Sequence, residues 1–184
     1  MLNATSIELI DRAKNGERTS IGQLYEEYHI HVYRYLYYLV SDVHMAEDLT
    51  SEVFLRMIRS LPNYRYQGIS FQAWLFQIAH NLAVDHFRKV GNRSQVELEE
   101  NLYSNDTDID ITVEQNLTSE SLRGALDRLN HAQREVIILR FVAGMPIAQV
   151  AQTLRKSEDT VKGLQRRGLG TLRKILDDWE MSYA

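Results

Sequence analysis

Apolar residues recur along most of this chain at spacings of three and four, which is the period of an amphipathic α-helix. In the first such stretch the apolar positions are Ile21, Leu24, Tyr25, Tyr28, Val32, Tyr35, Leu36 and Leu39. The spacing predicts one continuous helix with these side chains on its buried face.

Two further helices are predicted in the first half of the chain. One runs from about His44 to Leu61, and Pro62 stops it because proline cannot continue a helix. The segment 63–70 is then a loop. Ser70 is the predicted N-cap of the other helix, whose apolar face continues to about residue 87.

The middle of the chain breaks this pattern. Residues 91–118 show no sustained period and are rich in Asn, Asp and Ser. Residues 91–120 carry eight acidic side chains against one Arg, a net charge of −7. We therefore expect an acidic linker over 91–118 that joins an N-terminal domain, 1–90, to a C-terminal domain, 119–184.

The C-terminal segment predicts a helix-turn-helix. Asn130, with Gln133 three residues later, resembles a capping pair that opens a helix. A short helix over 147–154 follows, and Ser157 is the predicted N-cap of a basic last helix over about 158–179. A short helix, a tight turn and a basic second helix are the components of this DNA-binding motif.

The last helix has an apolar and a polar face. Its apolar positions, which should pack inward, are Val161, Leu164, Gly168, Leu172 and Ile175. The residues suited to phosphates and base edges are Ser157, Thr160, Lys162, Gln165, Arg166 and Arg167. Although the whole chain carries −4, residues 153–174 have seven basic and two acidic side chains, a net of +5. The local patch decides phosphate binding, so we interpret this face as DNA-binding; a merely solvated charged face is the alternative.

Composition limits the other classes of function. The 184 residues are 44% apolar and 25% charged, as in globular proteins, and the absence of cysteine excludes disulfide scaffolds and thiolate chemistry. We find no nucleophile–base pair, phosphate loop, dinucleotide fingerprint or helical zinc motif, so no catalytic residue, metal or cofactor is predicted. No secretion signal or membrane-length apolar run is present, which predicts a cytoplasmic protein without membrane insertion.

Two groups of motifs resemble those of bacterial sigma factors, in the order in which that family carries them. The first is His44-Met-Ala-Glu-Asp-Leu-Thr-Ser-Glu-Val-Phe with Trp74-Leu-Phe-Gln-Ile-Ala-His-Asn-Leu-Ala-Val-Asp-His-Phe-Arg. The second is Leu129-Asn-His-Ala-Gln-Arg-Glu, Ile147-Ala-Gln-Val-Ala and Thr160-Val-Lys. The similarity is to the extracytoplasmic-function class of the sigma-70 superfamily. It implies an all-α fold of two small domains, regions 2 and 4, in a promoter-specificity subunit of RNA polymerase that does no chemistry itself.

The resemblance also implies roles for single residues. Asp48, Glu52 and Phe54 would dock on the clamp helices of the polymerase β′ subunit, and the β subunit is a second expected contact. The helix after Ser157 would read the −35 element of promoter DNA. The residues expected at the −10 element are Tyr64, Tyr66, Ser70, Phe71, Asn81, Arg88 and Lys89. Aromatic rings there would stack on unpaired bases, and packing in the core or at its rim is the alternative for Tyr64, Tyr66 and Phe71. The family also leads us to expect an anti-sigma factor.

The chain departs from the family in the last helix, where Leu164 and Leu169 replace common arginines. Two other functions stay open: a free-standing helix-turn-helix regulator that dimerises through its N-terminal helices, and a helical adaptor that contacts only proteins. Whether the two domains touch in the free protein is also open. A closed form that hides Lys162 and Arg166 is one hypothesis.

Overall fold

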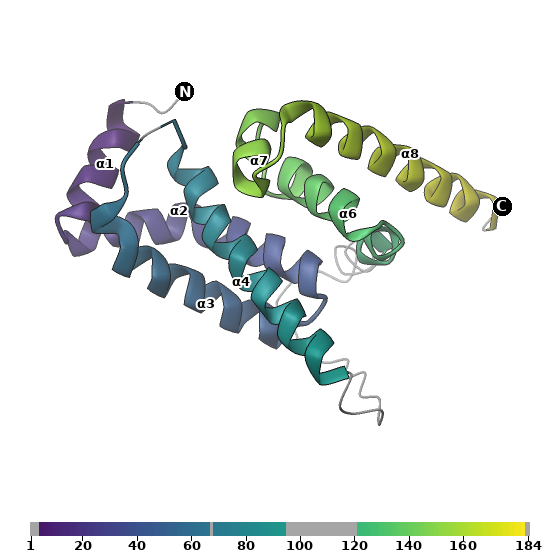
Figure 1. Ribbon diagram of the computed structural model, residues 1–184, viewed down its shortest axis with the longest axis horizontal. Coiled ribbons are helices and arrows are strands. Elements are labelled where there is room, and N and C mark those ends of the chain that lie inside the picture. The colour runs from purple at the N-terminus through teal and green to yellow at the C-terminus, as the bar shows by residue number, and fades with distance from the viewer. Residues whose placement is uncertain (1–3, 67, 95–120, 183–184) are drawn as a thin grey trace.

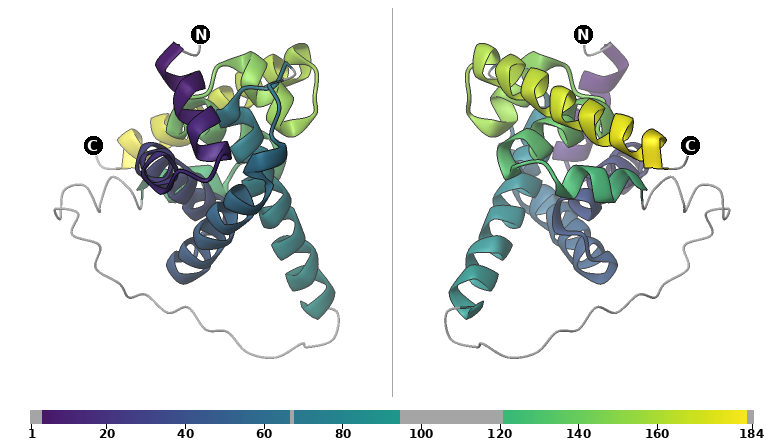
Figure 2. Two further views of the ribbon diagram at one scale, coloured as in Figure 1. Left: turned by 90° about the vertical axis from the view of Figure 1, so that its left-hand side faces the viewer. Right: turned by 90° about the vertical axis from the view of Figure 1, so that its right-hand side faces the viewer.

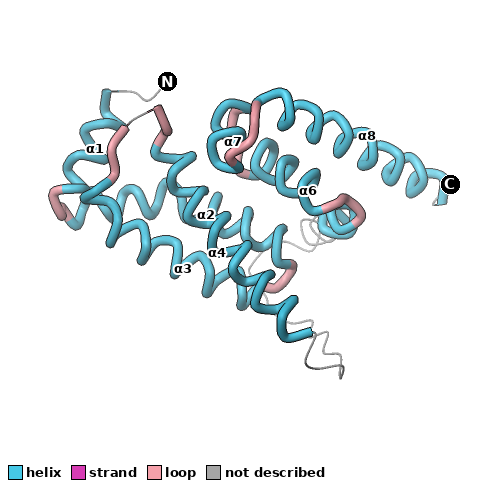
Figure 3. Tube along the Cα trace, in the orientation of Figure 1, coloured by secondary structure: helices cyan, strands magenta, loops and turns pink. Residues whose placement is uncertain are grey.

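A computed structural model describes residues 4–66, 68–94 and 121–182. Within these ranges the chain is helical, with short turns and no strand, as the sequence predicts (Figure 3). Most of the predicted linker lies outside the described residues.

The N-terminal domain consists of α1 (Ala4–Lys14), α2 (Arg18–Val40), α3 (Val43–Ser60), a 3-10 turn η1 (Leu61–Asn63) and α4 (Phe71–Ser94) (Figure 1). The three predicted helices are present, and α1 is an additional one. Helix α4 continues through residue 94, so its last turn occupies the beginning of the predicted linker.

Local capping explains where these helices begin. The Asp42 carboxylate accepts a hydrogen bond of 2.7 Å from the Met45 backbone N–H at the start of α3. The Ser70 hydroxyl accepts one of 3.1 Å from Ala73, as predicted for the start of α4. Gly68, just before this cap, has a φ of +79°, a conformation that favours glycine.

The C-terminal domain has a helical segment over residues 121–127, followed by α6 (His131–Ile137), a π-helical turn η2 (Ile138–Val142), α7 (Ile147–Leu154) and α8 (Glu158–Ser182). The Asn130 side chain caps α6 by accepting a 3.0 Å hydrogen bond from the Gln133 backbone N–H. Helices α7 and α8 form the predicted helix-turn-helix.

The turn between α7 and α8 relies on one unusual backbone conformation. Arg155 ends α7 at φ +52°, in the left-handed region, which is unfavourable for any residue with a Cβ. The following N–H of Lys156 returns to the Ala151 carbonyl at 3.0 Å, and Ser157 caps α8 by accepting from Thr160 at 3.2 Å. These bonds set the direction of α8.

The two domains pack against each other and share one hydrophobic cluster. Helix α7 contacts α4, and η2 contacts α2 (Figures 1 and 2). The sequence left this contact open, and the structure shows that it exists. Lys162 and Arg166 nevertheless stay exposed, so the hypothesis that closure hides them is wrong.

The inner face of α8 is the predicted one. Val161, Leu164 and Ile175 are buried, and Gly168 lies against α6. A Cβ added at Gly168 would meet Ile137 Cγ1 at 3.0 Å, whereas one at Gly170 would meet nothing within 4 Å. Close helix packing therefore explains the glycine at 168.

These two glycines give a matched pair of stability predictions. Gly170→Ala should raise the free energy of unfolding by up to about 1 kcal/mol, because alanine is the better helix former. Gly168→Ala should lower it, because Ile137 is buried and has little room to move aside. Chemical denaturation of both variants measures the difference, and an equal gain in both would contradict the packing argument.

Candidate nucleic-acid interface

The exposed face of α8 carries most of the predicted −35 contacts. Lys162, Arg166 and Arg167 are exposed on it. Lys162 Nζ lies 3.5 Å from Asp159 Oδ1 and 3.9 Å from Glu158 Oε2, pairs that are too exposed to hold the lysine strongly. The lysine can therefore leave its acidic neighbours for a phosphate.

The first turn of α8 is organised by its own hydroxyls. The Ser157 and Thr160 hydroxyls lie 2.8 Å apart, and Ser157 also accepts from the Thr160 backbone N–H. Both residues are exposed at the N-terminus of the helix, where the helix dipole favours an anion. This end of α8 can therefore face a phosphate.

Gln165, on the same face, is held by Arg140 from η2. Arg140 Nε donates to Gln165 Oε1 at 3.0 Å, and its Nη1 donates to the Met145 carbonyl oxygen. Arginine has only donors, so it turns the amide oxygen of Gln165 toward itself. The amide NH₂ is then the group left for a base edge.

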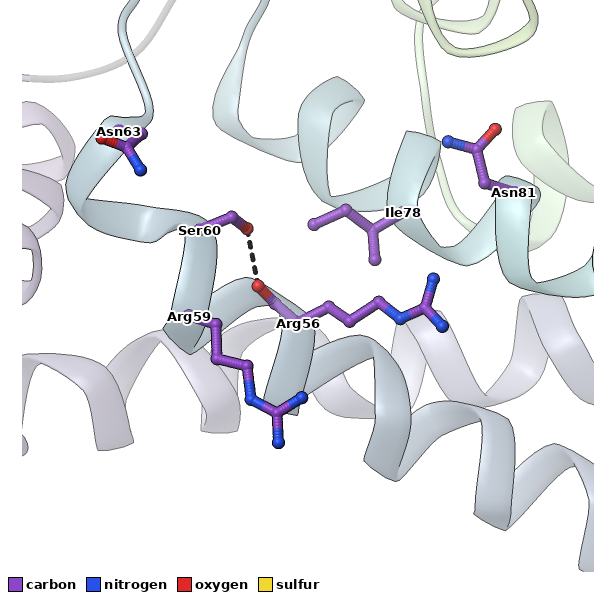
Figure 4. A pocket seen from close by; sticks show the side chains of 6 residues that line it. All are labelled: Arg56, Arg59, Ser60, Asn63, Ile78 and Asn81. Carbon is purple, nitrogen blue, oxygen red and sulfur yellow. Dashed lines mark hydrogen bonds between the residues drawn. The ribbon is translucent and has the colours of Figure 1, made fainter.

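A pocket of about 390 Å³ opens between α3 and α4, and Figure 4 shows its lining. The lining residues are Arg56, Arg59, Ser60, Asn63, Ile78 and Asn81. Arg56 extends toward α4 below Ile78 and pairs with Glu52 at 2.7 Å. The guanidinium and amide groups, together with the apolar side chain of Ile78, could bind a base and its phosphate.

The sequence prediction named Asn81 but missed Arg56 and Arg59 in this pocket. The sequence could have indicated both arginines, because they lie three residues apart in the last turns of the helix that leads into the proposed −10 loop. Other predicted −10 residues are also accessible: Tyr66 is 65% exposed, and Arg88 and Lys89 are exposed beyond the pocket on α4.

The predicted stacking role of Tyr64 and Phe71 at the −10 element needs correction. Both rings are buried, so neither faces solvent as a stacking surface. They pack on each other and on Trp74, with centroids 5.7 Å and 4.8 Å from Tyr64. The Tyr64 hydroxyl donates to the Ile69 carbonyl at 3.0 Å, and burial raises the pKa of Tyr64 to about 12. These rings hold the loop onto the start of α4, where Ser70 is the cap.

The predicted polymerase-binding helix α3 also needs one correction. Asp48 is exposed and Glu52 is half-buried, but Phe54 is only 4% exposed and packs edge-on against Tyr25 at 4.7 Å. At 100° per residue, Phe54 points away from the face that carries Asp48 and Glu52. The apolar side chain on that face is Leu55, which is 48% exposed.

Comparisons with known proteins identify both domains. The family model for sigma-70 region 2 matches residues 24–93, and the family model for sigma-70 region 4 matches residues 125–174. The chain belongs to the sigma-70 family. This sigma factor is 41% identical over 178 residues to the extracytoplasmic-function (ECF) RNA polymerase sigma factor BldN of Streptomyces coelicolor, covering 96% of this chain and 67% of BldN. It is 37% identical over 164 residues to the ECF sigma factor SigX of Bacillus subtilis, covering 84% and 82%.

These relatives place the sigma factor in the ECF class. It is therefore a promoter-specificity subunit of RNA polymerase, a transcription initiation factor. The solved complex of CnrH with the cytosolic domain of CnrY supports the fold alone, with a TM-score of 0.72, 22% identity and coverage of 92% of this chain and 96% of the other.

Two features are absent from the residues that the structure describes. None of their helices is long and apolar enough to cross a membrane. Nor do His, Asp and Glu side chains gather in these ranges in a group of three that could hold a metal ion.

The Arg140–Gln165 contact predicts how the sigma factor reads one −35 base pair. With its NH₂ facing outward, Gln165 should favour a base that presents acceptors in the major groove, such as guanine or thymine. Gln165→Glu should shift the preference toward bases that present donors, because a carboxylate only accepts. Transcription by polymerase with each variant, from promoters randomised over the −35 element, measures this.

The matched control for this prediction is Arg140→Met, which frees the amide to rotate. Adenine, which needs one donor and one acceptor from Gln, should then be tolerated at the same position. A wild-type protein that already selects adenine through Gln165 would contradict the proposed orientation.

Proposed function

We propose that this sigma factor acts by binding alone, with α8 on the −35 element, the α3–α4 pocket and adjoining loop on the −10 element, and the outer face of α3 on core polymerase. The observation that carries the −35 assignment is the face of α8. Its cations are exposed while the apolar side is buried in a capped helix-turn-helix. This is the arrangement that recognition helices use.

The −10 assignment is supported by the pocket and its surroundings. Melting DNA loses about 1.4 kcal/mol of stacking per base-pair step, so an unpaired base has to be held elsewhere. Arg56, Asn63 and Asn81 bring hydrogen-bond donors to this open surface pocket. Tyr66 is the exposed ring beside it in the chain and can supply the stacking that Tyr64 and Phe71 cannot.

The polymerase-facing surface is assigned to Asp48, Glu52 and Leu55 on α3. Glu52 and Asp48 lie one and two turns before Leu55, so the N-terminal part of this face suits a partner surface that joins an apolar contact to basic groups. The β′ clamp helices are the partner that the family implies for this helix, with β as the second subunit. An anti-sigma factor is the expected inhibitory partner, and the cytoplasm is the expected location because polymerase and DNA are there.

Transcription in vitro tests the proposal directly. Purified bacterial core polymerase is supplied with the DNA upstream of the gene for this protein, with and without the sigma factor. Initiation at one site only when the protein is present is the expected result. Failure to initiate, together with failure to bind core in a pull-down, would favour a free-standing regulator.

The cations of α8 give a quantitative prediction. Lys162→Ala with Arg166→Ala should weaken promoter binding by the holoenzyme and reduce its salt dependence. Each lost phosphate contact removes about 0.9 from the slope of log affinity against log salt. Titrations at several salt concentrations measure the slope. Lys14→Ala with Arg18→Ala removes the same charge far from α8, and an equal effect there would contradict the assignment.

The pocket gives a separate prediction. Asn81→Ala should lower transcription about tenfold to a hundredfold and reduce discrimination among −10 variants, as expected when one specific base contact is lost. Preference at the −35 element should not change. Val84→Ala is the matched control, because this exposed residue lies on α4 but does not line the pocket. Equal losses in both variants would contradict a role for the pocket.

A further inference from the structure

A buried carboxylate joins the two domains. Glu135 of α6 is 4% exposed, and its Oε1 accepts a 2.9 Å hydrogen bond from the Tyr35 hydroxyl of α2. The same oxygen lies 2.6 Å from Nδ1 of His80 on α4. Both of these partners belong to the N-terminal domain. When the domains touch, the Tyr35 hydroxyl and His80 replace the water that Glu135 loses, so the buried carboxylate fits only the arrangement that supplies both partners.

The fully buried Tyr35 is suited to this role. Its ring packs edge-on against Phe76 at 5.5 Å, so the hydroxyl has a fixed position. Burial, with the nearby charge of Glu135, raises the pKa of Tyr35 well above its usual value. The phenol therefore keeps its proton and remains a donor to Glu135.

The neighbouring residue makes a second contact with the same domain. Arg134 donates to the Tyr38 carbonyl oxygen in the last turn of α2 and, at 2.9 Å, to the Ser41 hydroxyl. Asp127 holds the guanidinium from the other side at 2.8 Å. The end of α2 carries the negative pole of its helix dipole, which suits a cation.

Helix α7 completes the interface along the first turns of α4. The Gln77 side chain donates to the Gln152 carbonyl at 2.8 Å, and the Gln152 side chain donates to Gly68 at 2.6 Å. Thr153 donates to the Ala73 carbonyl at 3.4 Å. The C-terminal domain therefore covers the end of the loop that we assign to the −10 element.

A closed molecule cannot reach both promoter elements. Their centres are about 25 base pairs apart, or roughly 85 Å at 34 Å per turn of DNA. A compact chain of this length is only about 40 Å across. The domains must separate when both elements are bound, and Glu135 then leaves Tyr35 and His80.

We propose that Glu135, Tyr35 and His80 form an intramolecular latch that holds the free sigma factor closed and must open before it can bind a promoter. The inference rests on the proposed function. The occupant of this surface on α2 and α4 is the C-terminal domain of the same chain. Because only open molecules can bind both elements, the closed state lowers the apparent affinity for polymerase and promoter in proportion to the fraction of molecules that are open.

A disulfide across the interface tests whether opening is required. The chain has no cysteine, and Ala73 and Thr153 are small, buried and adjacent. Ala73→Cys with Thr153→Cys should lose at least tenfold in transcription when oxidised and recover with reductant. The single-cysteine variants should not respond to oxidant. Equal transcription by the oxidised, cross-linked protein and by its reduced form would overturn the proposal. The proposed function is tested separately, by whether the wild-type protein supports transcription at all.

Variants of the latch itself test which residues hold it. Tyr35→Phe keeps the ring and removes one hydrogen bond, so the open fraction should rise about two- to tenfold. Glu135→Ala should open the molecule further. Small-angle scattering should show a larger radius of gyration with helical circular dichroism unchanged, and transcription at limiting sigma concentration should rise.

The matched control is Glu26→Ala, which removes an exposed carboxylate from α2 and should leave the radius and transcription unchanged. If Tyr35→Phe and Glu135→Ala stay as compact and as active as the wild type, Glu135 is a packing residue and the latch proposal is wrong. If Glu135→Ala unfolds, Tyr35→Phe decides between the two outcomes.

Discussion

Water can be removed from a carboxylate only if other donors replace it, and Glu135 receives its donors from helices of the opposite domain. These bonds join α6 to α2 and α4. Beside them, η2 contacts α2, and α7 lies along the first turns of α4. The arrangement joins two small domains into one hydrophobic cluster while the basic face of α8 points outward.

Turns, caps and close packing set the direction of the elements that we assign to DNA, and Arg140 holds Gln165 among them. The left-handed turn at Arg155 and the cap at Ser157 orient α8, and Gly168 lets it approach α6 closely. In the N-terminal domain, buried Tyr64 and Phe71 anchor the loop whose exposed ring is Tyr66. In both domains an apolar or hydrogen-bonded frame lies beneath a small number of exposed polar groups.

Features that depend on neighbours in sequence were predictable. The helices follow from their period, and the caps at Ser70, Asn130 and Ser157 act within three residues of themselves. The motif positions of Phe54 and Phe71 suggested contacts with partners, whereas the apolar period of their helices places both on a buried face. The burial of Tyr64 was not predictable, because it depends on how the loop folds back. The partners of Glu135 lie 100 and 55 residues away, so no local pattern marks them.

Residues 95–120, which lie between the end of α4 and the described part of the C-terminal domain, number 26. At 3.3–3.6 Å per residue, this connection can reach at most about 90 Å. It also keeps a separated C-terminal domain at a high effective concentration near its docking surface. Rejoining is therefore a first-order process, and diluting the protein does not favour the separated state.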